Sequence, residues 1–215
     1  MSQPVILPFD DFPIDNPLIN DMKSLLKSEF AYRVKRVPTG PAGMCYWNAE
    51  DNATQHGGNV SMGWMIEWVP GLFIQAMDHA VFVTKDGDMT DVTAVQIPRK
   101  TDTGFTTFIP NQERKFPVGF ELTPHNCFLP LCDDPLVEDS IKLYHDNFTA
   151  HNKRVMALMA SGHFTFNRGQ LAGNPRAVGG AFANEYNKHN AIVTDTSSKR
   201  NAVNARLMKK YFPQH

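Results

Sequence analysis

Three side chains of this sequence have the types needed for nucleophilic catalysis: Cys45, His79 and Asp91. A cysteine attacks a carbonyl carbon as the thiolate, so the chemistry needs a base that takes the thiol proton and later returns a proton to the leaving group. An imidazole does both near neutral pH, and a carboxylate can orient the ring and stabilise its charged form. The sequence therefore predicts a cysteine nucleophile with a histidine base.

The segment around Cys45 predicts a loop followed by a short helix. The loop VPTGPAGM is rich in Pro and Gly, and the helix is expected over residues 45–56, ended by Gly57 and Gly58. A cysteine at a helix N-terminus lies at the positive end of the helix dipole, which favours the thiolate. Asn48 follows one turn later on the same helix face, where it can help to hold an oxyanion or orient a substrate.

The chain then changes to the two-residue period of β-strands. Residues 59–70 alternate, with Trp64 on the apolar face, and residues 72–85 alternate with His79 among apolar neighbours. A polar ring in such a strand must be hydrogen-bonded or used in chemistry. Trp64 has two interpretations: it forms a wall of an active-site cleft, or it packs in the core, which is the commoner role of a tryptophan.

Asp86-Gly87 predicts a tight hairpin between the strand of His79 and the strand of Asp91. A two-residue turn at this point would pair Asp91 with Phe82 and place Asp91 on the opposite face of the sheet from His79. One extra residue would restore the face, so we predict a one-residue bulge between residues 86 and 91. Without that bulge, a different group must orient the imidazole.

These motifs resemble a known family of enzymes. A cysteine on a helix after a glycine-containing loop, followed by HAVFV, DG and DVT, is similar to the core of the transglutaminase-like branch of papain-like cysteine enzymes. The resemblance covers residues 40–95 or so and implies an α+β fold, in which the nucleophile helix packs on an antiparallel sheet. It also implies that Cys45 is the nucleophile, His79 the base and Asp91 the orienting carboxylate.

Composition narrows the functional classes. The 215 residues carry a formal net charge of −1, so charge indicates neither nucleic acid nor an acidic membrane as partner. No apolar stretch is long enough for a membrane span or a signal peptide, and three cysteines do not suggest a disulfide framework, so we expect a cytoplasmic protein. His125, Cys127 and Cys132 do not fit a standard zinc pattern, and no metal or organic cofactor is expected.

Residue patterns also predict the domain organisation. Proline-rich residues 1–16 are expected to form an extended arm, and residues 1–133 together the papain-like catalytic core. From the Asp134 cap onward the period is helical, so residues 134–215 are expected to form a mostly helical region packed on the same core. Within it, the glycine-rich segment 166–180 is expected to be a loop between separate helices.

The function we expect is a cysteine-dependent acyl-transfer enzyme that forms a Cys45 thioester with a peptide or carboxamide substrate: a peptidase, an amidase or a deamidase, or a transferase if an amine receives the acyl group. One alternative is a catalytically inactive binding or scaffold protein with the same core. A second alternative is a nucleic-acid-associated accessory protein that uses the basic segment 197–215, including Lys209 and Lys210. The sequence does not indicate an oligomeric state.

Overall fold

The chain forms two compact units. The computed structural model describes residues 4–117 and 121–213, and within these ranges one unit comprises residues 8–131 and the other residues 4–7 and 132–213. The predicted boundary after residue 133 lies close to the observed division. Within the segment predicted to be an extended arm, Asp10–Asp11 form a strand, and the N–H of Val5 donates to Asn201 Oδ1 (3.3 Å) in the helical unit. Residues 1–3 of that arm lie outside the described residues.

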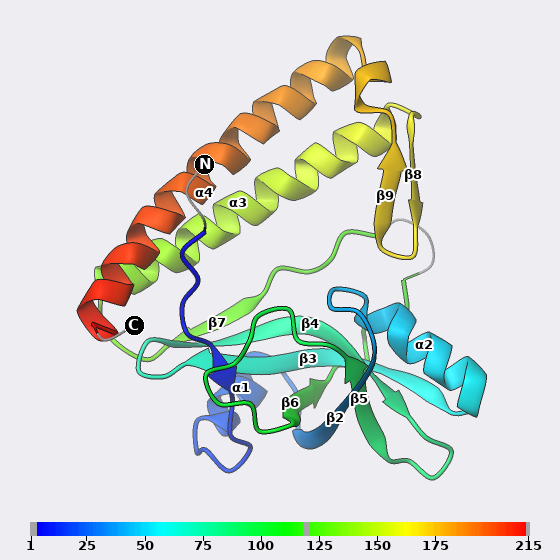
Figure 1. Cartoon of the computed structure of the whole chain (residues 1–215), viewed down its shortest axis with the longest axis vertical. Coiled ribbons are helices and arrows are strands. Elements are labelled where there is room, and N and C mark those ends of the chain that lie inside the picture. Colours follow the sequence, from blue (N-terminus) through cyan, green and yellow to red (C-terminus); the bar gives the residue numbers. More distant parts are fainter. Residues whose placement is uncertain (1–3, 118–120, 214–215) are drawn as a thin grey trace. The chain divides into compact units, whose positions relative to one another are not determined.

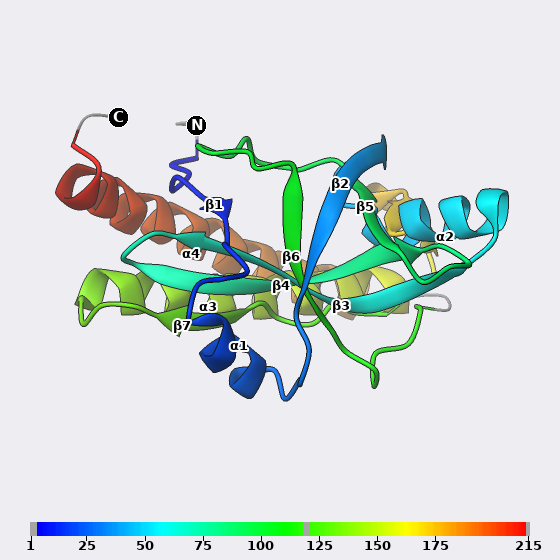
Figure 2. The same ribbon diagram turned by 90° about the horizontal axis from the view of Figure 1, so that it is seen from below.

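A barrel forms the centre of the unit of residues 8–131. The strands described in this unit are β1 (Asp10–Asp11), β2 (Tyr32–Gly40), β3 (Asn59–Val69), β4 (Phe73–Val83), β5 (Met89–Thr93), β6 (Phe105–Pro110) and β7 (Cys127–Pro130). The order β3-β6-β2-β5-β4 closes on itself because β4 also pairs with β3, while β1 and β7 extend the sheet at its two ends. In Figure 2, β2 and β6 cross the long β3–β4 pair steeply.

The expected α+β class is confirmed, but the expectation of an antiparallel sheet is wrong. The sheet is mixed, because β2 runs parallel to β5, with Arg36 paired to Asp91. Residues 32–40 carry a weak strand signal, since Pro38 and Gly40 are typical of loops. In the structure the register of β2 shifts between Arg36 and Gly40, and such an irregularity accommodates a proline within a strand.

Alternate residues of β3 and β4 face opposite sides of the barrel wall. On the outer side, Met22 of α1 (Ile19–Leu25) packs in a cluster with Trp64 and Ile66. Ala49 of α2 (Cys45–His56) packs in a second outer cluster, with Met62, Ala80 and Phe82. On the inner side, Val81 of β4 meets Val34 of β2 and Phe108 of β6. The helix that begins at Cys45 therefore packs on the sheet, as predicted.

Two long helices make up most of the second unit. α3 (Pro135–Ala160) and α4 (Gly180–Tyr211) lie side by side in opposite directions (Figure 1). Asp134 caps α3 as predicted, since its Oδ1 accepts from the N–H of Leu136 (2.9 Å). Between the helices, Ser140 Oγ donates to Asn204 Oδ1 (2.8 Å). No helix within the described residues is both long enough and apolar enough to span a membrane.

The glycine-rich segment between these helices is more ordered than a loop. It contains the hairpin of β8 (Phe164–Asn167) and β9 (Gln170–Gly173) and a short 3₁₀ helix over Pro175–Ala177. Arg168 and Gly169 both have positive φ (46° and 77°), as the two-residue turns of twisted hairpins require. After it, α4 is one continuous helix where two were expected.

Candidate active site

The hairpin between β4 and β5 has the one-residue shift that the sequence predicts. The N–H of Thr84 donates to the carbonyl of Asp88 (2.9 Å), and Phe82 pairs with Thr90. Three loop residues lie between Thr84 and Asp88, and the last of them, Gly87, has a φ of 92° that favours glycine in this type of loop. The shift that the bulge was predicted to produce is present as a three-residue loop, and it turns Asp91 to the same face as His79.

His79 and Asp91 are in contact inside the barrel. His79 Nε2 lies 3.1 Å from Asp91 Oδ1, and the two side chains are only 7% and 1% exposed. The two atoms are at ion-pair distance, but the ring N–H is not aligned for a hydrogen bond. Burial alone would lower the pKa of His79, but the charges of Asp91 and Cys45 and contacts with both outweigh burial and raise it well above the ordinary value of 6.5. The groups around the ring therefore favour its protonated form.

Asp91 is anchored by two donors besides the imidazole. Its Oδ1 accepts from the N–H of Thr93 (3.1 Å), and its Oδ2 accepts from the hydroxyl of Thr106 (2.6 Å). Burial disfavours the carboxylate, but the charge of His79 and these hydrogen bonds outweigh it and lower the pKa of Asp91. The carboxylate is thus ionised and fixed in orientation, as a group that orients a catalytic histidine must be.

Cys45 is the first residue of α2, and its half-buried side chain is close enough to His79 to contribute to the raised pKa of the imidazole. The preceding residue, Met44, provides no side-chain cap for the helix. The first backbone N–H groups of a helix have no partner within the helix, so this end of α2 can offer donors to negative charge that develops beside Cys45. The structure thus brings Cys45, His79 and Asp91 together in the predicted order.

Asn48 is used differently from the prediction. Its amide nitrogen donates to the carbonyl of Pro41 (2.8 Å) and to Thr93 Oγ1 (3.1 Å), so both amide hydrogens are engaged. A Cβ atom at Gly40 would overlap the same amide. In this arrangement Asn48 ties the loop before Cys45 to β5 and does not offer a donor to an oxyanion.

The structure does not bring the other candidates to this site. Trp64 is buried in the outer cluster with Met22, whereas Cys45 packs on the cluster around Ala49. Cys127 and Cys132 are free thiols, and burial raises the pKa of Cys127. In the described part of the chain, no three His, Cys, Asp or Glu side chains gather as a metal site would require.

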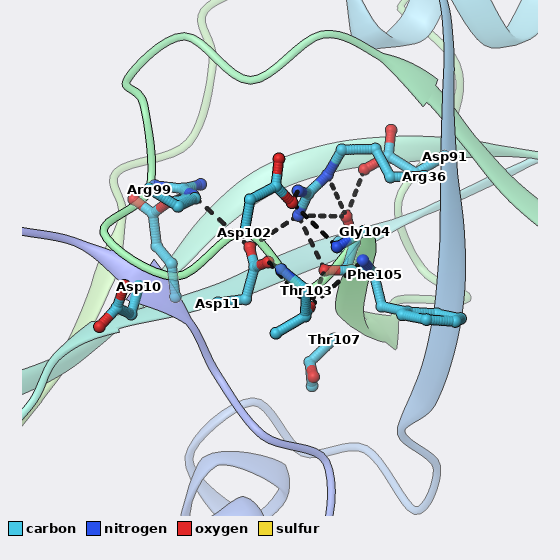
Figure 3. A network of polar contacts seen from close by, with 12 residues as sticks. Asp10, Asp11, Arg36, Asp91, Arg99, Asp102, Thr103, Gly104, Phe105 and Thr107 are labelled. Carbon is cyan, nitrogen blue, oxygen red and sulfur yellow. Dashed lines mark hydrogen bonds and ion pairs between the residues drawn. The ribbon is translucent and has the colours of Figure 1, made fainter.

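Sequence reasoning missed a buried network next to Asp91. Arg36 contacts Asp11 (Nη2–Oδ1, 2.7 Å) and Asp102 (Nη1–Oδ1, 3.0 Å), as Figure 3 shows. Arg99 contacts Asp11 (Nε–Oδ1, 3.5 Å) and forms an ion pair with Glu67. One signal was present, because Glu67 is a charged residue inside an alternating strand. The partners of Glu67 and Arg36 come from distant segments, and no local pattern identifies them.

A second polar cluster lies on the outer face beside Cys45. The hydroxyl of Tyr46 hydrogen-bonds with Asp78, and Arg114 Nη2 lies 3.6 Å from the same carboxylate. Burial and the charge of Asp78 raise the pKa of Tyr46, so the phenol keeps its proton and donates it. Burial also raises the pKa of Asp78. Tyr46 directly follows Cys45 in α2, and Asp78 directly precedes His79 in β4. The hydrogen bond between them therefore fixes α2 against β4 next to both candidate residues.

Comparisons with known proteins add no relative to this geometry. No protein-family model, no curated protein and no solved structure matches the chain.

Proposed function

We propose that this protein is a cysteine-dependent acyl-transfer enzyme with a papain-like core. The observation that carries the proposal is the buried His79–Asp91 pair, with Cys45 close enough to the imidazole to raise its pKa. Each residue comes from a different element, α2, β4 and β5, and no packing requirement of an apolar core calls for a thiol, an imidazole and a carboxylate in series.

The reaction follows from the order of the contacts. His79 takes the thiol proton of Cys45, and the resulting imidazolium is stabilised by Asp91. The thiolate attacks the carbonyl carbon of a peptide or carboxamide, and His79 returns the proton to the leaving amine as the thioester forms. Water, or a second amine, then attacks the thioester and releases the acyl group. The backbone N–H groups at the start of α2 support the negative charge on the carbonyl oxygen.

Selective alkylation tests whether Cys45 is the nucleophile. At neutral pH and a low dose of iodoacetamide, peptide mass spectrometry should find Cys45 modified at least about tenfold faster than Cys127, whose raised pKa leaves little thiolate. The H79Q variant should lose most of that advantage. Equal labelling of the three cysteines would contradict the proposal and favour the alternative of an inactive binding or scaffold protein.

A thioester would identify the reaction itself. The protein is incubated with peptides that carry a glutamine or a scissile amide, quenched in acid and weighed intact. An added mass on wild type, absent from C45A, is expected. Hydroxylamine should remove it, because a thioester is cleaved by that nucleophile.

The nucleic-acid alternative has less structural support. In the basic segment, Lys210 Nζ contacts Asp134 (2.8 Å), Lys199 contacts Asp195 (2.7 Å), and the Arg200 guanidinium stacks over Tyr144 (5.1 Å). These side chains are engaged within the helical unit. Binding to DNA or RNA that falls steeply with salt and is weakened in K209A would restore this alternative.

A further inference from the structure

Thr106 stands between Asp91 and a buried guanidinium. Its hydroxyl oxygen lies 2.6 Å from Asp91 Oδ2, 3.3 Å from Arg36 Nε and 3.2 Å from Arg36 Nη2. Thr106 is 1% exposed, and it belongs to β6, whereas Asp91 and Arg36 belong to the paired strands β5 and β2. The three side chains therefore meet only where three strands of the barrel come together.

The chemistry of the groups fixes the direction of these hydrogen bonds. A guanidinium only donates, so both contacts from Arg36 point at the lone pairs of the Thr106 oxygen. The single hydroxyl hydrogen must then point to Asp91 Oδ2. Since Thr93 N–H already donates to Oδ1, the carboxylate receives one protein donor on each oxygen and has one orientation open to it, with Oδ1 toward His79.

We propose that Thr106 is a positioning residue of the active site, which holds the Asp91 carboxylate on His79 and keeps it apart from Arg36. This inference rests on the proposed function, because it assigns Thr106 a role in the site of Cys45.

The separation from Arg36 is as important as the hydrogen bond. Arg36 carries a full charge in the barrel and already contacts Asp11 and Asp102 (Figure 3). Its Nε is one hydroxyl group away from Asp91. Without that hydroxyl, the guanidinium can pair directly with Asp91 in a buried, low-dielectric setting, where it competes with the imidazole for the carboxylate.

Several charged groups lie close enough to His79 to affect its pKa and have to be considered in a pH experiment. Asp91 approaches from β5 and Cys45 from α2, and both raise the pKa of the imidazole against the effect of burial. Glu67 on β3 and Asp78 on β4 also interact with its charge. The substitution at Thr106 leaves all four in place, so a change in the His79 titration reports on the Asp91 contact.

Three variants separate positioning from packing. Thr106→Val removes the hydroxyl and keeps the shape, and Thr106→Ser keeps the hydroxyl. Thr107→Val is the matched control, since Thr107 is the next residue of β6, is 3% exposed, and donates its hydroxyl to the carbonyl of Phe12 (2.5 Å), away from Asp91. Each variant is measured for the rate of Cys45 alkylation against pH and for the titration of the His79 ring by ¹⁵N NMR, with H79Q used for assignment.

The expected pattern is specific to the hydroxyl at position 106. In T106V, the rate of Cys45 alkylation at neutral pH should fall about tenfold, and the midpoint of the His79 titration should move down by about one pH unit. The reason is the loss of the hydrogen bond from Thr106 to the charged carboxylate of Asp91. T106S and T107V should stay within about twofold of wild type. An unchanged or raised His79 midpoint in T106V, or an equal effect in T107V, would overturn the proposal.

Other outcomes are also decisive. If Cys45 of the wild type is not selectively reactive, the proposed function fails, but the His79 titration of T106V still tests the contact. If T106V does not fold, the hydroxyl proton of Thr106 is measured in the wild-type protein by NMR. A hydroxyl proton that is bonded to Asp91 is protected from exchange with water and gives a visible signal. A hydroxyl proton that exchanges as fast as that of the exposed Thr101 would contradict the inference.

Discussion

Asp91 lies 3.1 Å from His79 although the two residues are not strand partners. On β4 the last observed pair is Phe82 with Thr90, and Asp91 pairs instead with Arg36 of the parallel strand β2. The contact is therefore diagonal across the point where β5 leaves β4 and joins β2. One residue in the hairpin loop determines whether the carboxylate faces the imidazole or the outside of the barrel.

Substitutions at Gly87 should separate the cost of its backbone conformation from the cost of steric overlap. Apart from the two adjacent residues, no atom of the described chain lies within 4 Å of a Cβ built at Gly87, so the cost of a side chain comes from its φ of 92°. G87A should lower the free energy of unfolding by about 1 kcal/mol, and G87N by less, because asparagine tolerates positive φ. Urea unfolding measures both. Equal losses in the two variants would contradict this explanation.

The contribution of the His79–Asp91 pair to stability should depend on pH in a defined way. The raised pKa of His79 stabilises the fold below the unfolded value of 6.5, and this stabilisation is lost as the pH rises through the folded pKa. The lowered pKa of Asp91 stabilises the fold above 3.8, and this is lost as the pH falls through the folded value. The difference in unfolding free energy between wild type and H79Q should be most favourable to wild type between those two values and decline at alkaline pH.

Urea unfolding across the pH range measures this difference, and the double variant H79Q/D91N serves as control. In this double variant, the decrease of the unfolding free energy at acid pH that remains in H79Q should disappear. A wild-type advantage that grows toward alkaline pH would show that the imidazole is held neutral instead.

Asn48 and Asn52 provide a matched pair on α2. Both are buried, and Asn52 donates to Thr39 Oγ1 and to the carbonyl of Asn48 (2.8 Å each). Each alanine variant should lose about 2 kcal/mol of stability, since each removes two hydrogen bonds made by a buried amide. Only N48A should also slow the alkylation of Cys45, because Asn48 fixes the loop before the thiol. Equal alkylation rates in the two variants would assign Asn48 a purely structural role.

The helical unit should depend on Asp134 through both its cap and its charge. Asp134 Oδ2 accepts from Lys210 Nζ (2.8 Å) and from the hydroxyl of Tyr211 (2.6 Å), and these bonds, with the cap, lower its pKa to about 2. At pH 7 the thermal midpoints should rank wild type above D134N, which keeps the cap, and D134N above D134A.

Acid should remove part of that ranking. The stabilisation by the Asp134 charge is present above the unfolded value of 3.8 and is lost as the pH falls through about 2. Calorimetry near pH 2 should therefore bring wild type and D134N together. A gap that persists there would mean that the charge is not the cause.

The parts of the site that the sequence predicted are those with local signals. Cys45 follows a loop that ends at a helix, His79 interrupts an alternating strand, and the requirement that Asp91 share the face of His79 was enough to predict the bulge. Asp134 and Pro135 marked the start of α3 in the same way. In each case the residue and its neighbours in the chain carry the information.

The remaining features depend on pairings between distant segments. Pro38 and Gly40 made β2 difficult to predict as a strand. Its strand geometry comes from pairing with β5 and β6 in the barrel and not from its own propensity. Thr106 and Arg36 reach Asp91 only through that closure. Asn48 was placed correctly on its helix, but its partners, Pro41 and Thr93, could not be read from helical spacing.

The parallel pairing of β2 with β5 has a consequence for how the protein is made. The two strands of this pair are far apart in the sequence, and so are the strands of the β3–β6 pair. Contacts between distant segments form late in folding, because they carry the largest loop-closure cost. A ribosome-bound chain that has not yet released β6 lacks Thr106, so the environment of Asp91 is incomplete. The thiol of Cys45 would then become reactive only when the barrel is complete. The chain still being synthesised would carry a thiol that is not yet activated.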